Sequence, residues 1–127
     1  MTVRIDLIGA GYVGTRLARS FEYVAAGREE DVDVRTYSRA DTASLADDPA
    51  RIRLMSEGSD VIVNATNDDQ HLNVLNILQH VDGFILSEKP LVAPQDSIPD
   101  RWTEAWGSGD RFAMNCIERY SPAVDYV

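Results

Sequence analysis

The chain has 127 residues, the size of one domain with a single core, and a second full domain does not fit. Twelve Lys and Arg stand against twenty-one Asp and Glu, and the net charge of -9 repels nucleic acid and anionic membranes, which we therefore exclude as partners. Lys89 is the only lysine, and Asp outnumbers Glu. This usage resembles proteins of salt-loving cells, and an ordinary acidic surface explains it equally well.

Cysteine content and hydropathy narrow the possible classes of protein further. The single cysteine, Cys116, excludes an intrachain disulfide and leaves no cysteine cluster for zinc, so we expect no metal site. No stretch approaches transmembrane length, and the charged Arg4 and Asp6 interrupt the N-terminal apolar segment, which argues against a signal peptide. We expect a cytoplasmic protein.

An apolar strand over residues 2–8 runs directly into a Gly-x-Gly-x-x-Gly sequence. Gly9 allows a tight turn, Gly11 lets the backbone approach a pyrophosphate, and Gly14 lets helix and strand pack closely. The helix expected over residues 11–26 offers its free N–H groups to phosphates. A phosphate-free structural turn is the alternative, but the flanking strand and helix favour a nucleotide site. The expected contacts are Gly9, Gly11, Tyr12, Val13 and Gly14.

The segment after this helix bears on the choice of nucleotide. The helix is expected to end at Gly27, because glycine suits the left-handed conformation beyond a helix C-terminus. A second strand is expected at residues 33–37. NAD-binding folds place Asp or Glu at the end of this strand, whereas this chain has Ser38 and Arg39. A hydroxyl and a guanidinium suit a 2′-phosphate, which favours NADP over NAD, with a plain surface role for Arg39 as the alternative.

The middle of the chain contains one weak and one strong signal. Residues 40–60 are polar, with a short helix expected after Pro49 and no convincing strand, so this connection is abbreviated. An apolar run at residues 60–65 predicts a central parallel strand covered on both faces. Asn67 or one of the two aspartates after it is expected to cap the next helix. His71, in the first turn of that helix, is more often a local hydrogen-bonding residue than a catalyst.

The last third of the chain continues the alternation of strands and helices. Strands are expected at residues 83–86 and 111–117, with a helix within residues 96–107 between them. Trp102 and Trp106 lie four apart on one helix face, which indicates core or interface rather than a cofactor platform. His80 is interpreted as a surface residue. The pattern predicts the α/β class, as a doubly wound, mostly parallel Rossmann sheet with helices on both faces.

Three blocks of sequence carry a family resemblance. They are Gly-Ala-Gly-Tyr-Val-Gly at residues 9–14, Val-Ile-Val-Asn-Ala-Thr at residues 61–66 with His71 five residues on, and Ser-Glu-Lys-Pro-Leu at residues 87–91. Together they resemble the N-terminal Rossmann domain of the glucose-fructose oxidoreductase / inositol dehydrogenase / rhizopine-catabolism (Gfo/Idh/MocA) oxidoreductase family. Residues 119–124 resemble the start of that family's crossing into a second domain.

The resemblance implies an NAD(P)-dependent oxidoreductase that moves a hydride to or from a sugar or polyol-like substrate. Lys89 would be the catalytic residue, facing the nicotinamide and the substrate, and Lys89-Pro90 would be a cis peptide. Asn67 stands where family members usually have proline. The further cofactor-binding residues that the resemblance implies are Ser38, Arg39, Ala65, Thr66, Asn67, His71, Glu88 and Lys89.

The resemblance also implies what this chain lacks. Residues 1–120 correspond to the NAD(P)-binding domain and residues 121–127 to the start of a connection, while the family's C-terminal sheet domain is absent. That domain supplies most substrate contacts and the usual oligomer interface, so substrate and oligomeric state stay open. The expected partners are a nicotinamide dinucleotide and an unknown small-molecule substrate. A noncatalytic nucleotide-binding or redox-sensing module is the alternative function.

Overall fold

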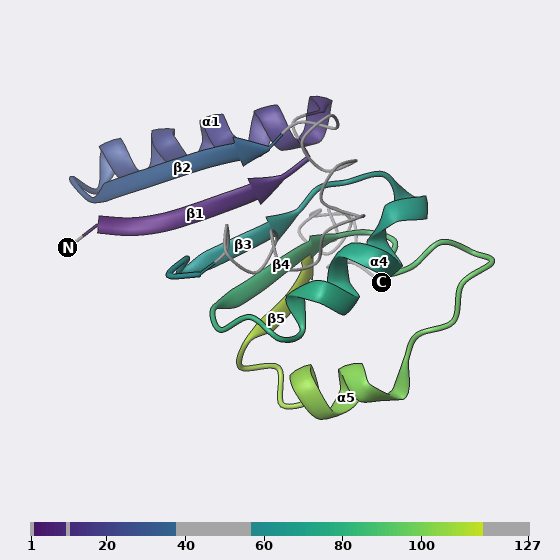
Figure 1. Ribbon diagram of the computed structural model, residues 1–127. Helices are drawn as coiled ribbons and strands as arrows, with labels where there is room; N and C mark the ends of the chain where they lie inside the picture. The colour runs from purple at the N-terminus through teal and green to yellow at the C-terminus, as the bar shows by residue number, and fades with distance from the viewer. Residues whose placement is uncertain (1, 10, 38–56, 116–127) are drawn as a thin grey trace, which may run out of the picture.

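A computed structural model of the protein describes residues 2–9, 11–37 and 57–115. The described chain forms a five-stranded, all-parallel sheet in the order β2-β1-β3-β4-β5 (Figure 1). The predicted α/β class and the parallel sheet are therefore confirmed. The elements are β1 (Thr2–Ile8), α1 (Tyr12–Gly27), β2 (Asp31–Tyr37), β3 (Val61–Asn64), α4 (Asp68–Leu78), β4 (Phe84–Glu88), α5 (Asp100–Trp106) and β5 (Phe112–Asn115).

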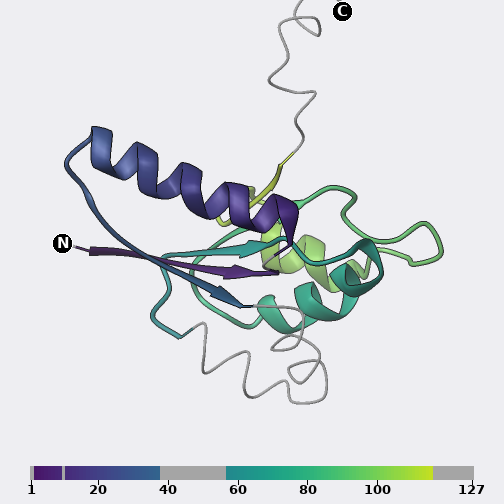
Figure 2. The same ribbon diagram turned by 90° about the horizontal axis from the view of Figure 1, so that it is seen from above.

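Helices cover both faces of the sheet. Figure 2 shows α1 on one face and α4 with α5 on the other. Successive side chains of a strand point to opposite faces, so β1 contributes to both layers. Ile5 and Leu7 pack with Leu17 and Phe21 of α1, whereas Ile8 belongs to the cluster under α4. This two-sided covering explains why the central strands are largely apolar.

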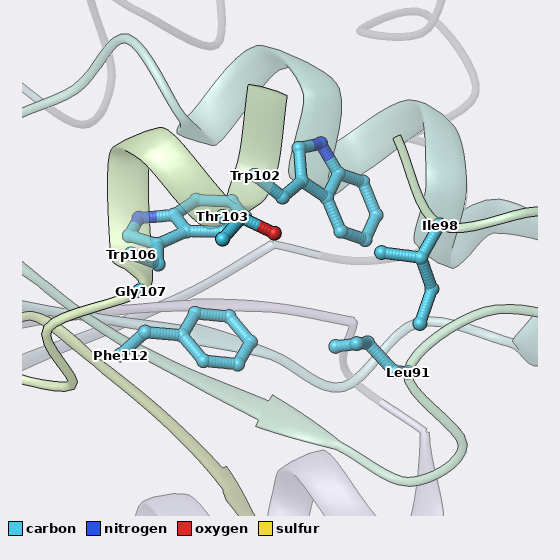
Figure 3. Close-up of a pocket in the computed structure, with 7 residues that line it drawn as sticks. All are labelled: Leu91, Ile98, Trp102, Thr103, Trp106, Gly107 and Phe112. Carbon is cyan, nitrogen blue, oxygen red and sulfur yellow. The ribbon is translucent and has the colours of Figure 1, made fainter. Parts of the chain in front are cut away.

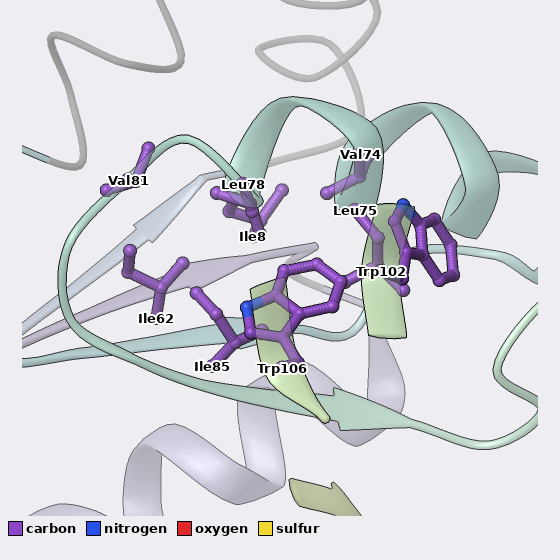
Figure 4. Close-up of a cluster of buried hydrophobic side chains, with 9 residues drawn as sticks. All are labelled: Ile8, Ile62, Val74, Leu75, Leu78, Val81, Ile85, Trp102 and Trp106. Atoms are coloured by element: carbon purple, nitrogen blue, oxygen red, sulfur yellow. The ribbon is translucent and has the colours of Figure 1, made fainter. Parts of the chain in front are cut away.

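The larger cluster of buried side chains lies between the sheet, α4 and α5 (Figure 4). Leu75 and Leu78 of α4 are fully buried in it. Trp102 and Trp106 are 3% and 7% exposed, and their ring centroids lie 5.6 Å apart. Trp106 also stacks on Phe112 of β5 at 4.8 Å. Of the two roles predicted for the tryptophans, the structure shows the core role.

The predicted conformation at the end of α1 is wrong, although the helix ends at Gly27 as expected. The helix continues through Gly27, and the left-handed residue is Glu29, with a φ of 55°. The backbone N–H groups of Arg28 and Glu30 donate to carbonyl oxygens of the last turn, including that of Ala25. These bonds satisfy the helix end without a left-handed glycine.

Other strand boundaries differ from prediction by one or two residues, as at β2 and β4. α5 lies within the predicted range of residues 96–107 and begins at Asp100, because Pro99 occupies its N-cap and a residue before proline is disfavoured in helical conformation. Asn67 is the N-cap of α4 as predicted, but its side chain makes no capping hydrogen bond among the described residues. The predicted helix after Pro49, the last two residues of the predicted final strand, Cys116 and residues 119–127 lie outside the described residues.

Candidate functional site

The first element of the site is the turn after β1. Gly9 has a φ of 104°, and its N–H donates to the carbonyl oxygen of Tyr37 at the end of β2. A Cβ at Gly9 would lie 2.5 Å from the carbonyl oxygen of Ala65, just beyond β3. Both the left-handed conformation and this contact require glycine. The predicted tight turn is confirmed, and it packs against the chain that leaves β3.

The next two glycines of the turn differ from one another. A Cβ at Gly14 would lie 1.9 Å from the Gly9 carbonyl oxygen, so the first turn of α1 presses directly on the glycine turn. A Cβ at Gly11 would meet nothing within 4 Å among the described residues. Within the same residues, no side chain caps α1 and its first turn holds no acidic side chain. The open space and the uncapped helix N-terminus together fit an anionic group such as a pyrophosphate.

A buried polar network links the carboxyl ends of β3 and β4. Asn64 is fully buried, and its Oδ1 accepts hydrogen bonds from the Thr66 hydroxyl at 2.7 Å and the Thr66 N–H at 3.4 Å. Its Nδ2 donates to Ser87 Oγ at 3.2 Å. Asn64 and Ser87 are partners in the parallel register. This network was not predicted, because Asn64 was expected only as part of an apolar run, although an amide at the end of such a run is itself a signal.

His71 joins the segments that follow these two strands. Its side chain is fully buried in the first turn of α4. Nδ1 lies 2.6 Å from the carbonyl oxygen of Pro90, and Nε2 lies 2.9 Å from the carbonyl oxygen of Thr66. The predicted hydrogen-bonding role is confirmed, but only Thr66 is a local partner, because Pro90 is 19 residues away in the chain.

The predicted catalytic residue lies at the same edge of the sheet. Lys89 is the first residue after β4, its side chain is exposed, and Lys89-Pro90 is the predicted cis peptide. Glu88 is the last residue of β4 and half-buried. Gly9, residues 65–67 and Lys89 thus follow β1, β3 and β4, three adjacent parallel strands. Ligands of open α/β sheets bind outside this carboxyl edge.

Four of the predicted site residues have no described side chain. Tyr12 and Val13 are the first residues of α1, and only their backbone is described. Ser38 and Arg39 directly follow β2 but lie outside the described residues. Their predicted roles stay predictions.

A second polar network, missed by the sequence analysis, lies on the sheet face opposite α1. Asp6 is 1% exposed, and its carboxylate accepts hydrogen bonds from Arg4 Nη2 at 3.1 Å, from the Tyr37 hydroxyl at 3.4 Å and from Ser59 Oγ. It thereby ties β1 to the end of β2 and to the turn before β3. A lone acid in the middle of a buried strand is the sequence signal that could have revealed it.

This network predicts how stability changes at alkaline pH. Burial raises the pKa of Tyr37 above its ordinary value of 10.0, and the charge of Asp6 raises it further. Because the folded pKa exceeds the unfolded one, the stabilisation is complete below about pH 10 and is lost as pH rises through the folded value. Tyr37→Phe should therefore flatten the fall of unfolding free energy above about pH 10, measured by urea titration at each pH. Tyr23→Phe is the control, since Tyr23 is 83% exposed, and an equal change in both variants would contradict the expectation.

The structure also has an apolar cavity of about 170 Å³ beside α5 (Figure 3). The polar side-chain groups of its lining residues are the Thr103 hydroxyl and the indole N–H groups of Trp102 and Trp106. The cavity offers no charged group for phosphates, so it is not the place for a dinucleotide. Its lining includes Leu91, Ile98, Trp102, Thr103, Trp106 and Phe112.

Two negative findings apply to residues 2–9, 11–37 and 57–115. No helix in these ranges is long and apolar enough to cross a membrane. No group of three His, Cys, Asp or Glu residues in them could hold a metal ion.

Comparison with solved structures reveals a likeness in fold. The WlbA (WbpB) dehydrogenase from Thermus thermophilus, in complex with NAD and UDP-GlcNAcA, aligns with a TM-score of 0.59 and 24% identity over 94% of this chain and 43% of that chain. A levoglucosan dehydrogenase in complex with NADH and levoglucosan aligns with a TM-score of 0.46 and 20% identity over 72% of this chain and 28% of that one. No protein-family model and no curated protein sequence matches this chain. The first likeness shows a Rossmann-like fold, and this chain spans 43% of that dehydrogenase's length.

Proposed function

We propose that this chain is the cofactor-binding domain of an NAD(P)-dependent oxidoreductase of the Gfo/Idh/MocA type. The observation that carries the proposal is the glycine turn, in which Gly9 and Gly14 are fixed by contacts and Gly11 faces open space at the N-terminus of α1. This arrangement has the donors and the room that a pyrophosphate needs. In this proposal residues 1–120 form the NAD(P)-binding domain and residues 121–127 begin a connection to a second domain.

The other contacts follow from the order of the strands. The backbone N–H groups of Tyr12 and Val13 would donate to the pyrophosphate beside the glycines. Residues 65–67 and Glu88, at the ends of β3 and β4, would hold the nicotinamide ribose and ring. Ser38 and Arg39 would hold the adenosine ribose.

The reaction that fits is hydride transfer between a dinucleotide and a carbinol or carbonyl carbon of a sugar or polyol-like substrate. The dinucleotide, when bound, supplies the hydride chemistry at its nicotinamide ring. As alcohol is oxidised, the neutral Lys89 amine would take the proton of the substrate hydroxyl, and as carbonyl is reduced the Lys89 ammonium would donate a hydrogen bond to the substrate oxygen and return that proton. The exposed position of Lys89 at the end of β4 supports this role, since it leaves the ammonium accessible to a substrate.

We expect the protein to prefer NADP over NAD. The WlbA (WbpB) dehydrogenase is in complex with NAD, whereas Ser38 and Arg39 here provide a hydroxyl and a guanidinium for a 2′-phosphate. One or two charge-assisted hydrogen bonds correspond to a preference of about tenfold to several hundredfold. Ser38→Asp combined with Arg39→Ala should reverse the order by restoring a ribose acceptor. Calorimetric titration of both proteins with both cofactors tests this, and equal parent affinities would contradict it.

Turnover assays separate this proposal from the noncatalytic alternative. The 127-residue chain should bind dinucleotide and turn over little substrate by itself, because one lysine without a substrate pocket lacks the orientation that supplies much of the rate. Adding a C-terminal domain of the family's type should restore turnover. Dinucleotide binding with no turnover in the joined protein would favour a binding or sensing module.

A further inference from the structure

Both ring nitrogens of His71 contact backbone carbonyl oxygens outside its own helix. The carbonyl oxygens of Thr66 and Pro90 belong to segments that follow β3 and β4 and are 24 residues apart in the chain numbering. Both groups can only accept hydrogen bonds, so the imidazole is the donor: a neutral ring donates to one carbonyl oxygen and contacts the other, and a ring with hydrogen on both nitrogens donates to both. The ring therefore acts as a bridge between two segments and not as a cap of α4.

The fold holds α4 in place without this bridge. Val74, Leu75 and Leu78 bury the inner face of the helix against the sheet. The segment after β4, in contrast, has no helix or strand until Asp100. A fully buried ring placed against Pro90 fixes the backbone directly beside Lys89, where regular hydrogen bonding does not.

We propose that His71 is a positioning residue that bridges Thr66 and Pro90, so that residues 65–67 and Lys89 form one preorganised surface for the nicotinamide half of a dinucleotide. The proposal rests on the proposed function of the chain. It deepens that function by assigning His71 a role that acts through backbone carbonyls, with no contact between the imidazole and the cofactor. Preorganised segments bind more tightly because less ordering remains to be done on binding.

The test compares two probes in the same variants. A reduced dinucleotide contacts both halves of the site, whereas the matching ADP-ribose, with or without its 2′-phosphate, lacks the nicotinamide and reaches only the glycine-turn half. His71→Leu should weaken binding of the reduced dinucleotide about tenfold and leave the ADP-ribose affinity unchanged. His71→Asn can keep a donor near Pro90 and His71→Gln one near Thr66, so each should lose about threefold. His80→Leu is the control, since His80 is exposed.

The outcomes separate this inference from the function it rests on. If the parent protein binds neither probe by calorimetry, the proposed function fails and the inference fails with it. If the parent binds both probes and His71→Leu changes both affinities equally, or neither, His71 has a structural role and the inference alone is overturned. Thermal melts followed by circular dichroism check that each variant folds. If His71→Leu does not fold, the test uses His71→Asn and His71→Gln instead, and compares the affinity of each variant for the reduced dinucleotide with its affinity for the ADP-ribose.

Discussion

Gly14→Ala is expected to lower the free energy of unfolding by about 3 kcal/mol or more, at the upper end of the cost of overpacking a tight interior. The added Cβ would lie 1.9 Å from the carbonyl oxygen of Gly9 and 2.9 Å from Leu7 Cδ2. The Leu7 side chain could move aside, but the Gly9 carbonyl could not. It belongs to a backbone turn that is held by the hydrogen bond from the Gly9 N–H to the Tyr37 carbonyl oxygen and by close packing against Ala65. The first turn of α1 therefore has to move away from the sheet.

Gly11→Ala is the matched control for this variant. Its Cβ would meet nothing within 4 Å among the described residues, and the φ of -76° at Gly11 suits alanine. We expect its stability to stay within about 1 kcal/mol of the parent, since a less favourable N-cap is offset by lower unfolded-state entropy. Urea unfolding followed by circular dichroism measures both variants. Equal stabilities of Gly14→Ala and Gly11→Ala would contradict the packing seen at the turn.

The same pair of variants separates packing from binding. The proposed function places a pyrophosphate over Gly11, so Gly11→Ala should weaken dinucleotide binding while the protein stays folded. Loss of binding in a folded Gly11→Ala protein would support the pyrophosphate site, and unchanged affinity would contradict it.

The parts of the fold that were predictable from sequence are those set by neighbouring residues. The strand of residues 2–8, its glycine turn and the helix behind it follow from hydrophobic period and from the backbone freedom of Gly9. The left-handed residue after α1 was not predictable in this way, because the backbone N–H groups of Arg28 and Glu30 satisfy the last carbonyls and Glu29, not Gly27, takes that conformation. Local propensity gave the wrong residue where backbone hydrogen bonds determined the result.

The candidate site depends on contacts between segments distant in sequence. The bond between Asn64 and Ser87 exists because β3 and β4 pair in parallel with these two residues opposite each other, and no local pattern specifies that register. His71 could be assigned a hydrogen-bonding role from its place in the helix, but its partners could not. They become visible only when the carboxyl ends of β3 and β4 are side by side.

Asp6→Ala is expected to destabilise the protein by about 3 kcal/mol, at the lower end of the cost of breaking a buried ion pair. The carboxylate is 1% exposed, and three donors, from Arg4, Tyr37 and Ser59, point to it. Its removal leaves them with no acceptor at that place and opens a cavity on β1. The lower end applies because the Arg4 side chain is 23% exposed, so water can solvate part of the guanidinium.

A second ion pair of the same length provides the control for Asp6→Ala. Asp33 and Arg35 also lie 3.1 Å apart, but their side chains are 46% and 51% exposed. Solvent screens such a pair, so Asp33→Ala should leave the unfolding midpoint in urea close to that of the parent. Asp6→Asn keeps one acceptor oxygen and most of the shape, and it should fall between Asp6→Ala and the parent. If Asp6→Ala and Asp33→Ala shift the midpoint equally, burial of the Asp6 carboxylate adds nothing to its ion pair. The carboxylate would then not hold β1, β2 and the turn before β3 together.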